Sequence, residues 1–126
     1  MNDLTTSLGF AASGMQAQAT RLRHVSENIA NADTPGYHRK TISFHEEMDS
    51  GQVTAGPVRL DRSELTRIYD PGNPLADETG YYDGSNVDLV LEIADAREAQ
   101  RSYEANLRMF DQARQMTQSL FDLLRR

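Results

Sequence analysis

The side chains that could perform chemistry are few, and their spacing does not favour it. The chain of 126 residues has three histidines, His24, His38 and His45, and no cysteine. No histidine has a partner at the spacing of a zinc site, and His45-Glu46-Glu47 does not match the His-Glu-x-x-His pattern. A catalytic triad can still assemble in space, but no nucleophile elbow or phosphate-binding loop occurs. We therefore expect no enzyme, no cofactor and no metal site.

The distribution of charge argues against binding to nucleic acid or to an anionic membrane surface. The formal net charge is −6, and the acidic excess lies in residues 41–86, which hold nine acidic and three basic residues. Residues 1–40 and 87–126 are nearly neutral. Nucleic-acid binding needs a basic patch, so we expect no such partner. Nearly neutral ends suit helices that must associate with copies of themselves.

The sequence contains no recognisable targeting or membrane segment. Residues Met1 to Thr5 lack a basic region followed by an apolar core, and no run of about 18 apolar residues occurs. We expect no membrane insertion and no cleaved signal peptide. Export of the protein would then need another route.

Glycine and proline divide the chain into three zones. All four prolines and six of the eight glycines lie between residues 33 and 86, whereas residues 87–126 contain neither. Because both residues disfavour helix interiors, the pattern predicts a mainly α fold. We expect residues 1–32 and 85–126 to pair as a helical coiled-coil core, and residues 33–84 to form an irregular middle segment with turns and a short β element.

The first helical zone has the heptad spacing of a coiled coil. Its two seam positions recur every seven residues and hold Leu8, Met15, Leu22 and Ile29 at one and Leu4, Ala11, Gln18 and Val25 at the other. Gly9 and Gly14 each weaken the helix by about 1 kcal/mol relative to alanine. The helix therefore needs a partner, and we expect its seam to face the C-terminal helix or a neighbouring subunit.

The last zone predicts a second amphipathic helix. Ser85 and Asp88 resemble a capping box, which predicts that the helix starts there. Its seam positions hold Tyr103, Leu107, Phe110, Phe121 and Leu124. A second apolar stripe widens this face and holds Met109, Met116, Leu120 and Leu123. A stripe this wide indicates contacts on more than one side of the helix.

Turn signals follow the first helix and recur in the middle zone. The first helix should end near Asn31, because Pro35 biases the preceding residue away from helical angles. Residues 34–37, Thr-Pro-Gly-Tyr, fit a type II turn, and residues 70–73, Asp-Pro-Gly-Asn, fit another turn. One half-buried strand is expected within residues 38–48, and strand signals are weak between residues 49 and 69.

Two blocks of sequence resemble the flagellar rod and hook proteins. The first, residues 26–37, resembles their N-terminal signature through Asn28, Ala30, Asn31, Thr34, Pro35, Gly36 and Tyr37. The second, residues 69–81, is similar to proximal rod proteins through Pro71, Gly72, Asn73 and Pro74. Residues 85–88 and 101–106 extend the second resemblance, so that the blocks reach both helices and much of the middle.

This resemblance implies a structural subunit of the bacterial flagellar rod. Copies would surround a central axis through their terminal helices, with the middle segment outside. The implied partners are copies of the chain, other rod proteins, MS-ring proteins at the rod base and the flagellar type III export apparatus. The protein would lie in the periplasmic part of the basal body. Phe44 and Met48 also resemble an export motif, phenylalanine-x-x-x-hydrophobic, although a plain strand with Phe44 buried explains them equally well.

Other functions remain open at this point. The chain could be a different axial rod subunit, or a free cytoplasmic helical adaptor or export chaperone that forms a discrete dimer. A small hydrolase is disfavoured by the inventory of side chains. Cell fractionation separates the exported subunit from the cytoplasmic adaptor.

Overall fold

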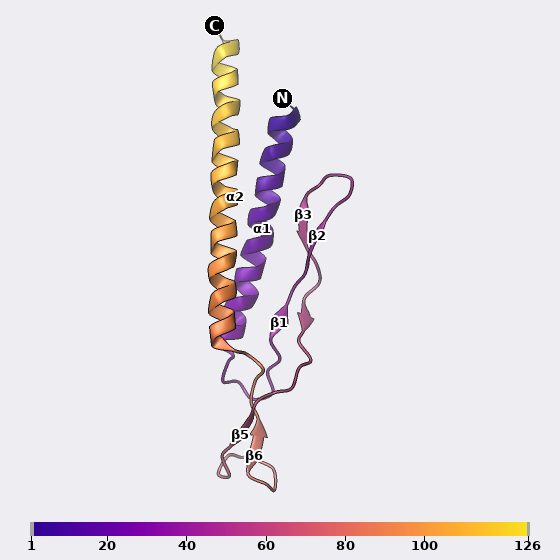
Figure 1. The fold of residues 1–126 in the computed structure, drawn as a ribbon, viewed down its shortest axis with the longest axis vertical. Coiled ribbons are helices and arrows are strands. Elements are labelled where there is room, and N and C mark those ends of the chain that lie inside the picture. Colours follow the sequence, from indigo (N-terminus) through magenta and orange to yellow (C-terminus); the bar gives the residue numbers. More distant parts are fainter. Residues whose placement is uncertain (1, 126) are drawn as a thin grey trace.

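The computed structural model describes residues 2–125, which form two long helices side by side with slender hairpins (Figure 1). Helix α1 spans Asn2–Ala30 and helix α2 spans Leu89–Leu124. Between them lie β1 (Lys40–Thr41), β2 (Phe44–Glu46), β3 (Val53–Ala55), β4 (Arg59–Leu60), β5 (Arg67–Tyr69) and β6 (Tyr81–Asp83). The predicted mainly α fold with paired terminal helices is confirmed.

Small side chains form the contact between the antiparallel helices. The buried apolar residues of the described chain are Ala11, Ala17, Val25, Ala99 and Ala113. Gly14 lies so close to α2 that a Cβ atom built on it would be 2.6–2.8 Å from the amide atoms of Asn106. Hydrophobic stabilisation scales with the apolar area removed from water. This seam therefore stabilises the subunit weakly, and many of the larger apolar side chains are only half-buried or are exposed.

Helix α1 ends where the sequence predicts, at a turn that the glycine permits. The last helical residue is Ala30, and the side-chain Nδ2 of Asn31 donates to the carbonyl of Glu27 at 2.8 Å. The Tyr37 N–H then donates to the Thr34 carbonyl at 3.2 Å, and Gly36 has a φ of +74°. These features are those of the predicted type II turn.

Strands β1 to β4 form one long interrupted hairpin that runs along α1 (Figure 1). β2 pairs with β3 and β1 pairs with β4, all antiparallel. Between the two short sheets, the Gly56 N–H donates to the Ser43 carbonyl at 2.7 Å, so the pairing continues. The prediction of one half-buried strand within residues 38–48 is wrong in detail, because this segment holds two strands, β1 and β2. β2 is exposed, and β3 makes most of the contact between the strands and α1.

A second hairpin, β5–β6, lies at the end of the molecule opposite the start of α1 (Figure 1). The rings of Tyr69 and Tyr81 are in contact across it, with centroids 5.0 Å apart and their planes tilted by 58°. Arg67 joins its two sides by donating to Asp77 at 2.7 Å and to Asp83 at 3.0 Å. Strands β3, β4 and β5 all lie where the sequence signals are weak.

Helix α2 begins later than the capping pattern predicts. Asp88 is the N-cap residue, and its Oδ1 atom accepts a hydrogen bond from the N–H of Val90 at 3.0 Å. Ser85 does not cap the helix, because its hydroxyl donates to the carbonyl of Ala32, two residues beyond the end of α1. Ser85 therefore links the segment before α2 to the segment after α1 instead of capping α2.

Candidate functional site

A cluster of polar side chains holds the two helices and the long hairpin together at the end of α1. We call it the polar junction and define it as Asn28, Tyr37, Arg39, Asp61, Asn86 and Glu92. Asn28 and Glu92 are the largest completely buried side chains of the described residues. Burying polar groups costs free energy unless their hydrogen bonds are satisfied, so the bonding of this cluster decides whether it stabilises the fold.

Asn28 of α1 binds the segment that follows the turn, from Tyr37 to Lys40. Its Oδ1 atom accepts hydrogen bonds from the Tyr37 hydroxyl and from the Lys40 N–H, both at 2.8 Å. Its Nδ2 atom donates to the Lys40 carbonyl at 3.0 Å and to Glu92 at 3.3 Å. The side-chain amide thus pairs with one residue of β1 as a neighbouring strand would.

Arg39 and Glu92 form a largely buried ion pair within the junction. The Nε atom of Arg39 donates to Oε1 of Glu92 at 2.6 Å, and Glu92 is completely inaccessible to solvent. Partial burial lowers the pKa of Arg39, but the bonds and charges of Glu92 and Asp61 outweigh it, and the net shift is upward. The guanidinium therefore stays charged and compensates the buried carboxylate.

Asn86 completes the junction from the segment before α2. Its Oδ1 atom accepts the N–H of Arg39 at 2.7 Å, and its Nδ2 atom donates to the Asp61 carbonyl at 2.9 Å. Asn86 therefore links both strands of the long hairpin to the start of α2.

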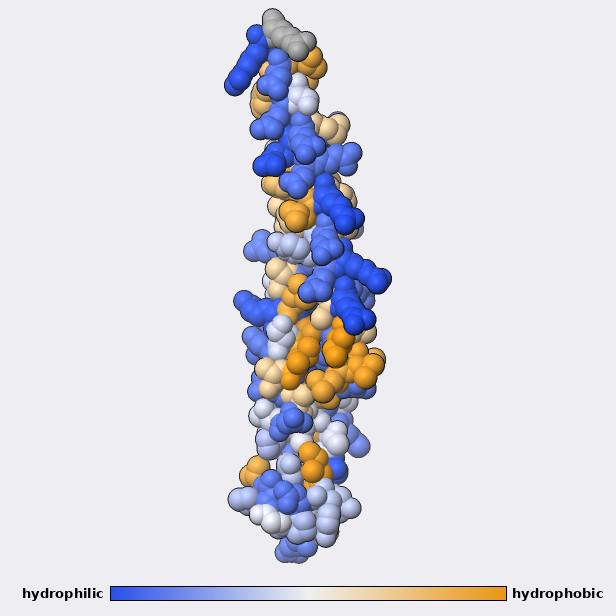
Figure 2. Space-filling model, turned by 90° about the vertical axis from the view of Figure 1, so that its left-hand side faces the viewer, coloured by the Kyte–Doolittle hydropathy of each residue, from blue (hydrophilic) through white to orange (hydrophobic). Residues whose placement is uncertain are grey.

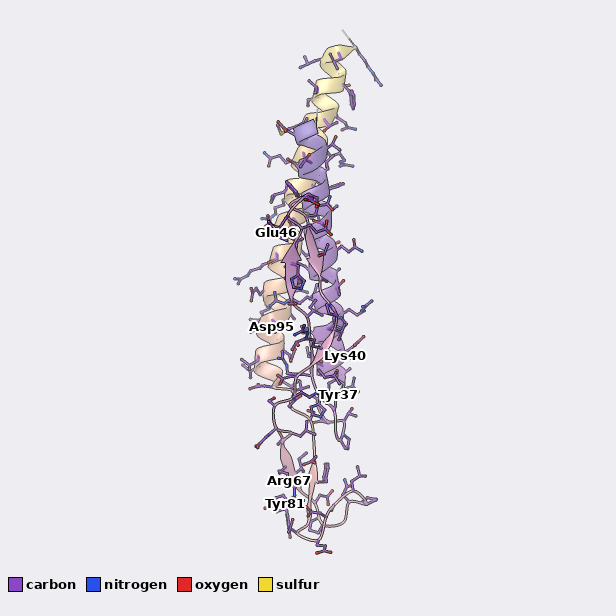
Figure 3. All side chains as sticks on the ribbon, turned by 90° about the vertical axis from the view of Figure 1, so that its right-hand side faces the viewer. Tyr37, Lys40, Glu46, Arg67, Tyr81 and Asp95 are labelled. Atoms are coloured by element: carbon purple, nitrogen blue, oxygen red, sulfur yellow. The ribbon has the colours of Figure 1, made fainter. Side chains whose placement is uncertain are left out.

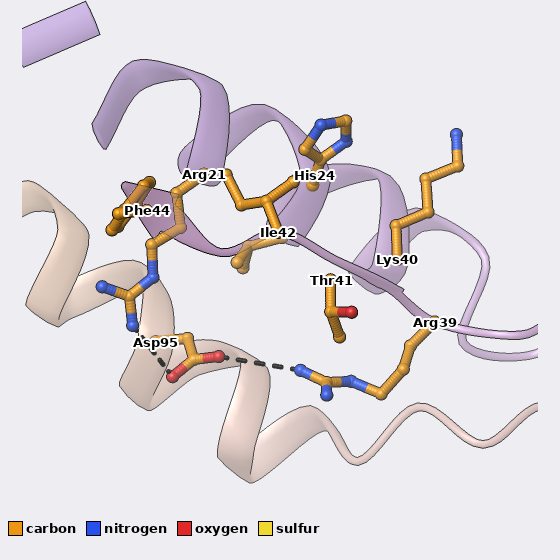
Figure 4. Close-up of a pocket in the computed structure, with 9 residues that line it drawn as sticks. Arg21, His24, Arg39, Lys40, Thr41, Ile42, Phe44 and Asp95 are labelled. Atoms are coloured by element: carbon orange, nitrogen blue, oxygen red, sulfur yellow. Dashed lines mark hydrogen bonds and ion pairs between the residues drawn. The ribbon is translucent and has the colours of Figure 1, made fainter. Parts of the chain in front are cut away.

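A cavity of about 360 Å³ lies beside the junction, between α1, α2 and β1. Asp95 bridges two cations in it, 3.2 Å from Arg21 and 3.7 Å from Arg39 (Figure 4). His24 is buried at its edge, and neither ring nitrogen has a hydrogen-bond partner among the described residues, although Nδ1 is 3.7 Å from the Glu27 carboxylate. The ion pairs of Asp95 with Arg21 and Arg39 thus link α1, α2 and the segment before β1.

The signature residues of the first block occupy this junction and the adjoining turn. Asn31 accepts a hydrogen bond from the Thr34 hydroxyl at 3.0 Å, which shapes the turn. The Gly36 N–H donates to the carbonyls of Asp83 and Gly84, so the turn also holds the base of β6. Ala30 and Pro35 are exposed at the helix end and at the turn.

The residues of the second block shape the tip of the β5–β6 hairpin. The N–H of Asn73 donates to the Asp70 carbonyl at 3.0 Å, closing the expected turn around Pro71 and Gly72. The Oδ1 atom of Asn73 accepts the N–H of Leu75 at 2.9 Å, which holds the segment that follows Pro74. The block is therefore mainly exposed and far from the helix seam.

The predicted seam residues differ in burial. Ala11 and Val25 are buried, and several are half-buried, namely Leu4, Leu8, Met15, Leu22, Tyr103 and Phe110. The more exposed ones are Ile29, Leu107, Phe121 and Leu124. A contact of these half-buried and exposed residues with neighbouring subunits stays a prediction.

The two residues of the expected export motif lie on the long hairpin. Phe44 is in β2 and borders the cavity, with 36% of its surface exposed. Met48 lies at the hairpin tip and is fully exposed. Their role in export stays a prediction.

Sequence reasoning missed the roles of Arg39, Asp61, Asn86 and Glu92. Glu92 follows the predicted helix start, and no sequence pattern distinguishes it from the other acidic residues of the helix. Asn86 lay within a block of the family resemblance, and that was the one available signal.

Among residues 2–125, no group of three potential ligands lies where it could hold a metal ion. No described helix is both long and apolar enough to span a membrane.

Comparison with known proteins defines the class of this molecule. Residues 8–38 match the family described as flagella basal body rod protein. Residues 78–123 match the family described as flagellar basal body rod FlgEFG protein C-terminal. The two matches cover most of both helices and the signature turn. They define a flagellar axial protein of the rod type.

Curated relatives narrow the class. The chain is 46% identical to the flagellar basal-body rod protein FlgC of Agrobacterium fabrum, over 99% of the chain and 98% of that relative. It is 35% identical to FlgC of Aquifex aeolicus, over 97% and 98% of the two chains, and 35% identical to FlgC of Salmonella typhimurium, over 84% and 87%. The chain therefore belongs to the FlgC family of flagellar basal-body rod proteins and is a structural subunit of the rod. These matches give no support to the alternatives of another axial subunit or a cytoplasmic adaptor or chaperone.

Proposed function

We propose that this rod subunit polymerises through the outward faces of its two terminal helices, which contact copies of the chain and other rod proteins. The observation that carries the proposal is the small seam between α1 and α2, where four of the five buried apolar residues of the described chain are alanine. Large apolar side chains such as Leu107, Phe121 and Leu124 remain exposed. Exposed apolar surface on this scale is typical of an interaction site.

Leu8, Met15, Leu22 and Ile29 form the proposed contact stripe of α1. They recur every seven residues and are half-buried or exposed in the single subunit. Fully burying an exposed leucine contributes about 1.5–3 kcal/mol, and burying the rest of a half-buried one contributes roughly half of that. That contribution would recur in each subunit of the rod, so a single polar substitution should weaken the whole assembly.

The experiment compares Leu22→Asp with Ala19→Asp in cells that lack the wild-type chain. Ala19 is an exposed residue of the same helix, so its substitution adds the same charge without removing a large apolar side chain. We expect Leu22→Asp to abolish swimming while the protein is still secreted, because a carboxylate would be buried without a partner. Ala19→Asp should swim. Wild-type swimming by Leu22→Asp cells would contradict the proposed packing face.

We also propose that the chain leaves the cytoplasm through the flagellar type III apparatus without cleavage, and that it meets MS-ring proteins at the base of the rod. Phe44 and Met48 are the residues proposed to engage the export apparatus. Phe44→Ala should reduce secretion while expression persists. Val58→Ala removes another exposed apolar side chain from the same hairpin region and serves as the control. Equal secretion by both variants would leave Phe44 with a purely structural role.

A further inference from the structure

The tip of the long hairpin carries an acidic cluster around a projecting methionine. Glu46, Glu47 and Asp49 flank Met48, whose side chain is fully exposed. Among the described residues, none of the three carboxylates forms an ion pair, and the single side-chain bond among them runs from the Ser50 hydroxyl to Glu47. An exposed methionine among unpaired carboxylates has no role in holding the subunit together.

A groove of opposite character lies on the outer face of α2. Its lining residues are Val90, Ile93, Ala94, Arg97, Glu98 and Arg101, around a volume of about 560 Å³. Figure 2 shows this face, where hydrophobic side chains gather beside strongly hydrophilic ones. Val90 is 75% exposed, so the apolar floor is open to solvent.

The rim of the groove is basic. Arg97 and Arg101, together with Arg108 farther along the same face, form no ion pair with any residue of the described chain. The carboxylate of Glu98, which also lines the groove, is 3.4 Å from Arg21 of α1. Glu104 lies among these arginines in the sequence, so the free charge of the face is positive but not large.

The hairpin tip and the groove face opposite sides of one subunit. The hairpin lies along α1 (Figure 1), whereas the groove residues are all exposed positions of α2, on the side away from its buried residues Glu92 and Ala99. Figure 3, viewed from the hairpin side, shows Glu46 on the near face. The two surfaces of a single chain therefore cannot meet each other.

We propose that the hairpin tip of one copy docks into the α2 groove of a second copy, with Met48 against the apolar floor and its flanking carboxylates against Arg97 and Arg101. The proposal rests on the complementarity of the two surfaces. The hairpin tip has an apolar centre flanked by carboxylates, and the groove has an apolar floor flanked by arginines. The contact joins two different surfaces, so each copy can bind one neighbour by its hairpin and another by its groove. Such a heterologous contact propagates into a ring or a helical array. This inference rests on the proposed polymerisation.

A disulfide trap tests the contact in assembled rods. The wild-type chain has no cysteine, so a chain carrying Met48→Cys and Ala94→Cys holds the only two thiols of this subunit. Isolated basal bodies from oxidised cells should then yield a ladder of multiples of the 14.1 kDa chain on a non-reducing gel. Each single variant should give no ladder. Absence of a ladder from the double variant in assembled rods would overturn the proposal, as would equal dimers from the single Met48→Cys variant.

Charge reversal supplies the second arm. Glu46→Lys with Asp49→Lys, or Arg97→Glu with Arg101→Glu, should each reduce the ladder about tenfold or more, because like charges would then face one another. Combining both reversals in one chain should restore it. A ladder insensitive to either reversal would overturn the proposal.

The two proposals fail in different ways. If the reversed chains enter basal bodies and the cells swim normally, the docking contact is wrong while polymerisation through the helices stands. If Leu22→Asp cells swim like the wild type, polymerisation through the helix faces fails instead, whatever the ladder shows.

Discussion

The side-chain Nδ2 atom of Asn28 lies 3.3 Å from the Oε2 atom of Glu92, and both residues are completely shielded from solvent. This bond joins α1 to α2 across 64 positions of sequence. Asn28 also pairs with the backbone of Lys40, so one amide connects both helices to the long hairpin. The junction thus fixes the middle segment relative to the helical core.

Loss of the Asn28 amide should destabilise the subunit strongly. Asn28→Ala removes four hydrogen bonds and leaves Glu92 and the Tyr37 hydroxyl short of a partner. Each buried polar group left unsatisfied costs about 1–3 kcal/mol, so we expect a loss of at least about 3 kcal/mol in the free energy of unfolding. Thermal unfolding followed by circular dichroism measures it. Tyr37→Phe, which removes one of these bonds, should cost about 1 kcal/mol, and equal losses would contradict a central role for Asn28.

The pair of Arg39 and Glu92 should be replaceable as a unit but not one residue at a time. Glu92→Leu leaves the Arg39 guanidinium partly buried without its nearest carboxylate, and breaking such a pair costs about 3–5 kcal/mol. Replacing both residues by leucine removes both charges and should recover much of that loss. Chemical denaturation of the single and double variants tests the coupling. Additive losses would show that the two side chains act independently.

Gly14 should tolerate a side chain only if Asn106 is shortened. A Cβ atom at residue 14 would meet the Asn106 amide at 2.6 Å, and that amide is held by a bond to the Ser102 carbonyl. We expect Gly14→Ala to lower the melting temperature despite the gain of about 1 kcal/mol in helix propensity. Adding Asn106→Ala should remove the clash and restore stability. Gly9→Ala provides the control, since its Cβ would meet the side-chain end of Gln52 alone, and it should be neutral or stabilising.

The β5–β6 hairpin should lose order in acid. Hydrogen bonds from Thr79 and Arg67 hold the pKa of Asp77 well below its ordinary value of 3.8. A carboxyl group with a lowered folded pKa stabilises the fold above its unfolded pKa, and this contribution disappears as the pH falls below that value. The near-ultraviolet circular dichroism of Tyr69 and Tyr81 should therefore decrease between about pH 4 and pH 2. Asp77→Asn should weaken the signal at neutral pH and flatten the titration, and an unchanged titration would contradict the assignment.

The sequence by itself determined the two terminal helices and the turn after α1. Heptad spacing, the absence of glycine and proline after residue 86, and the Thr34–Tyr37 signature all act locally, through backbone propensity and side-chain period. Local rules of this kind can be read without knowing which segments meet. They also carried the family resemblance, since the signature residues are close together in the chain.

Tertiary structure decided which side chains were buried. Glu92 and Glu98 lie on the same helix, yet Glu92 is completely buried and Glu98 is exposed, because Asn28 and Arg39 approach α2 only near its start. Likewise, the seam closed on alanines and Gly14 because close approach of two helix backbones favours the smallest side chains, and larger side chains such as Leu107 and Phe121 stayed exposed. Both outcomes depend on partners more than 50 residues apart, which no local pattern specifies.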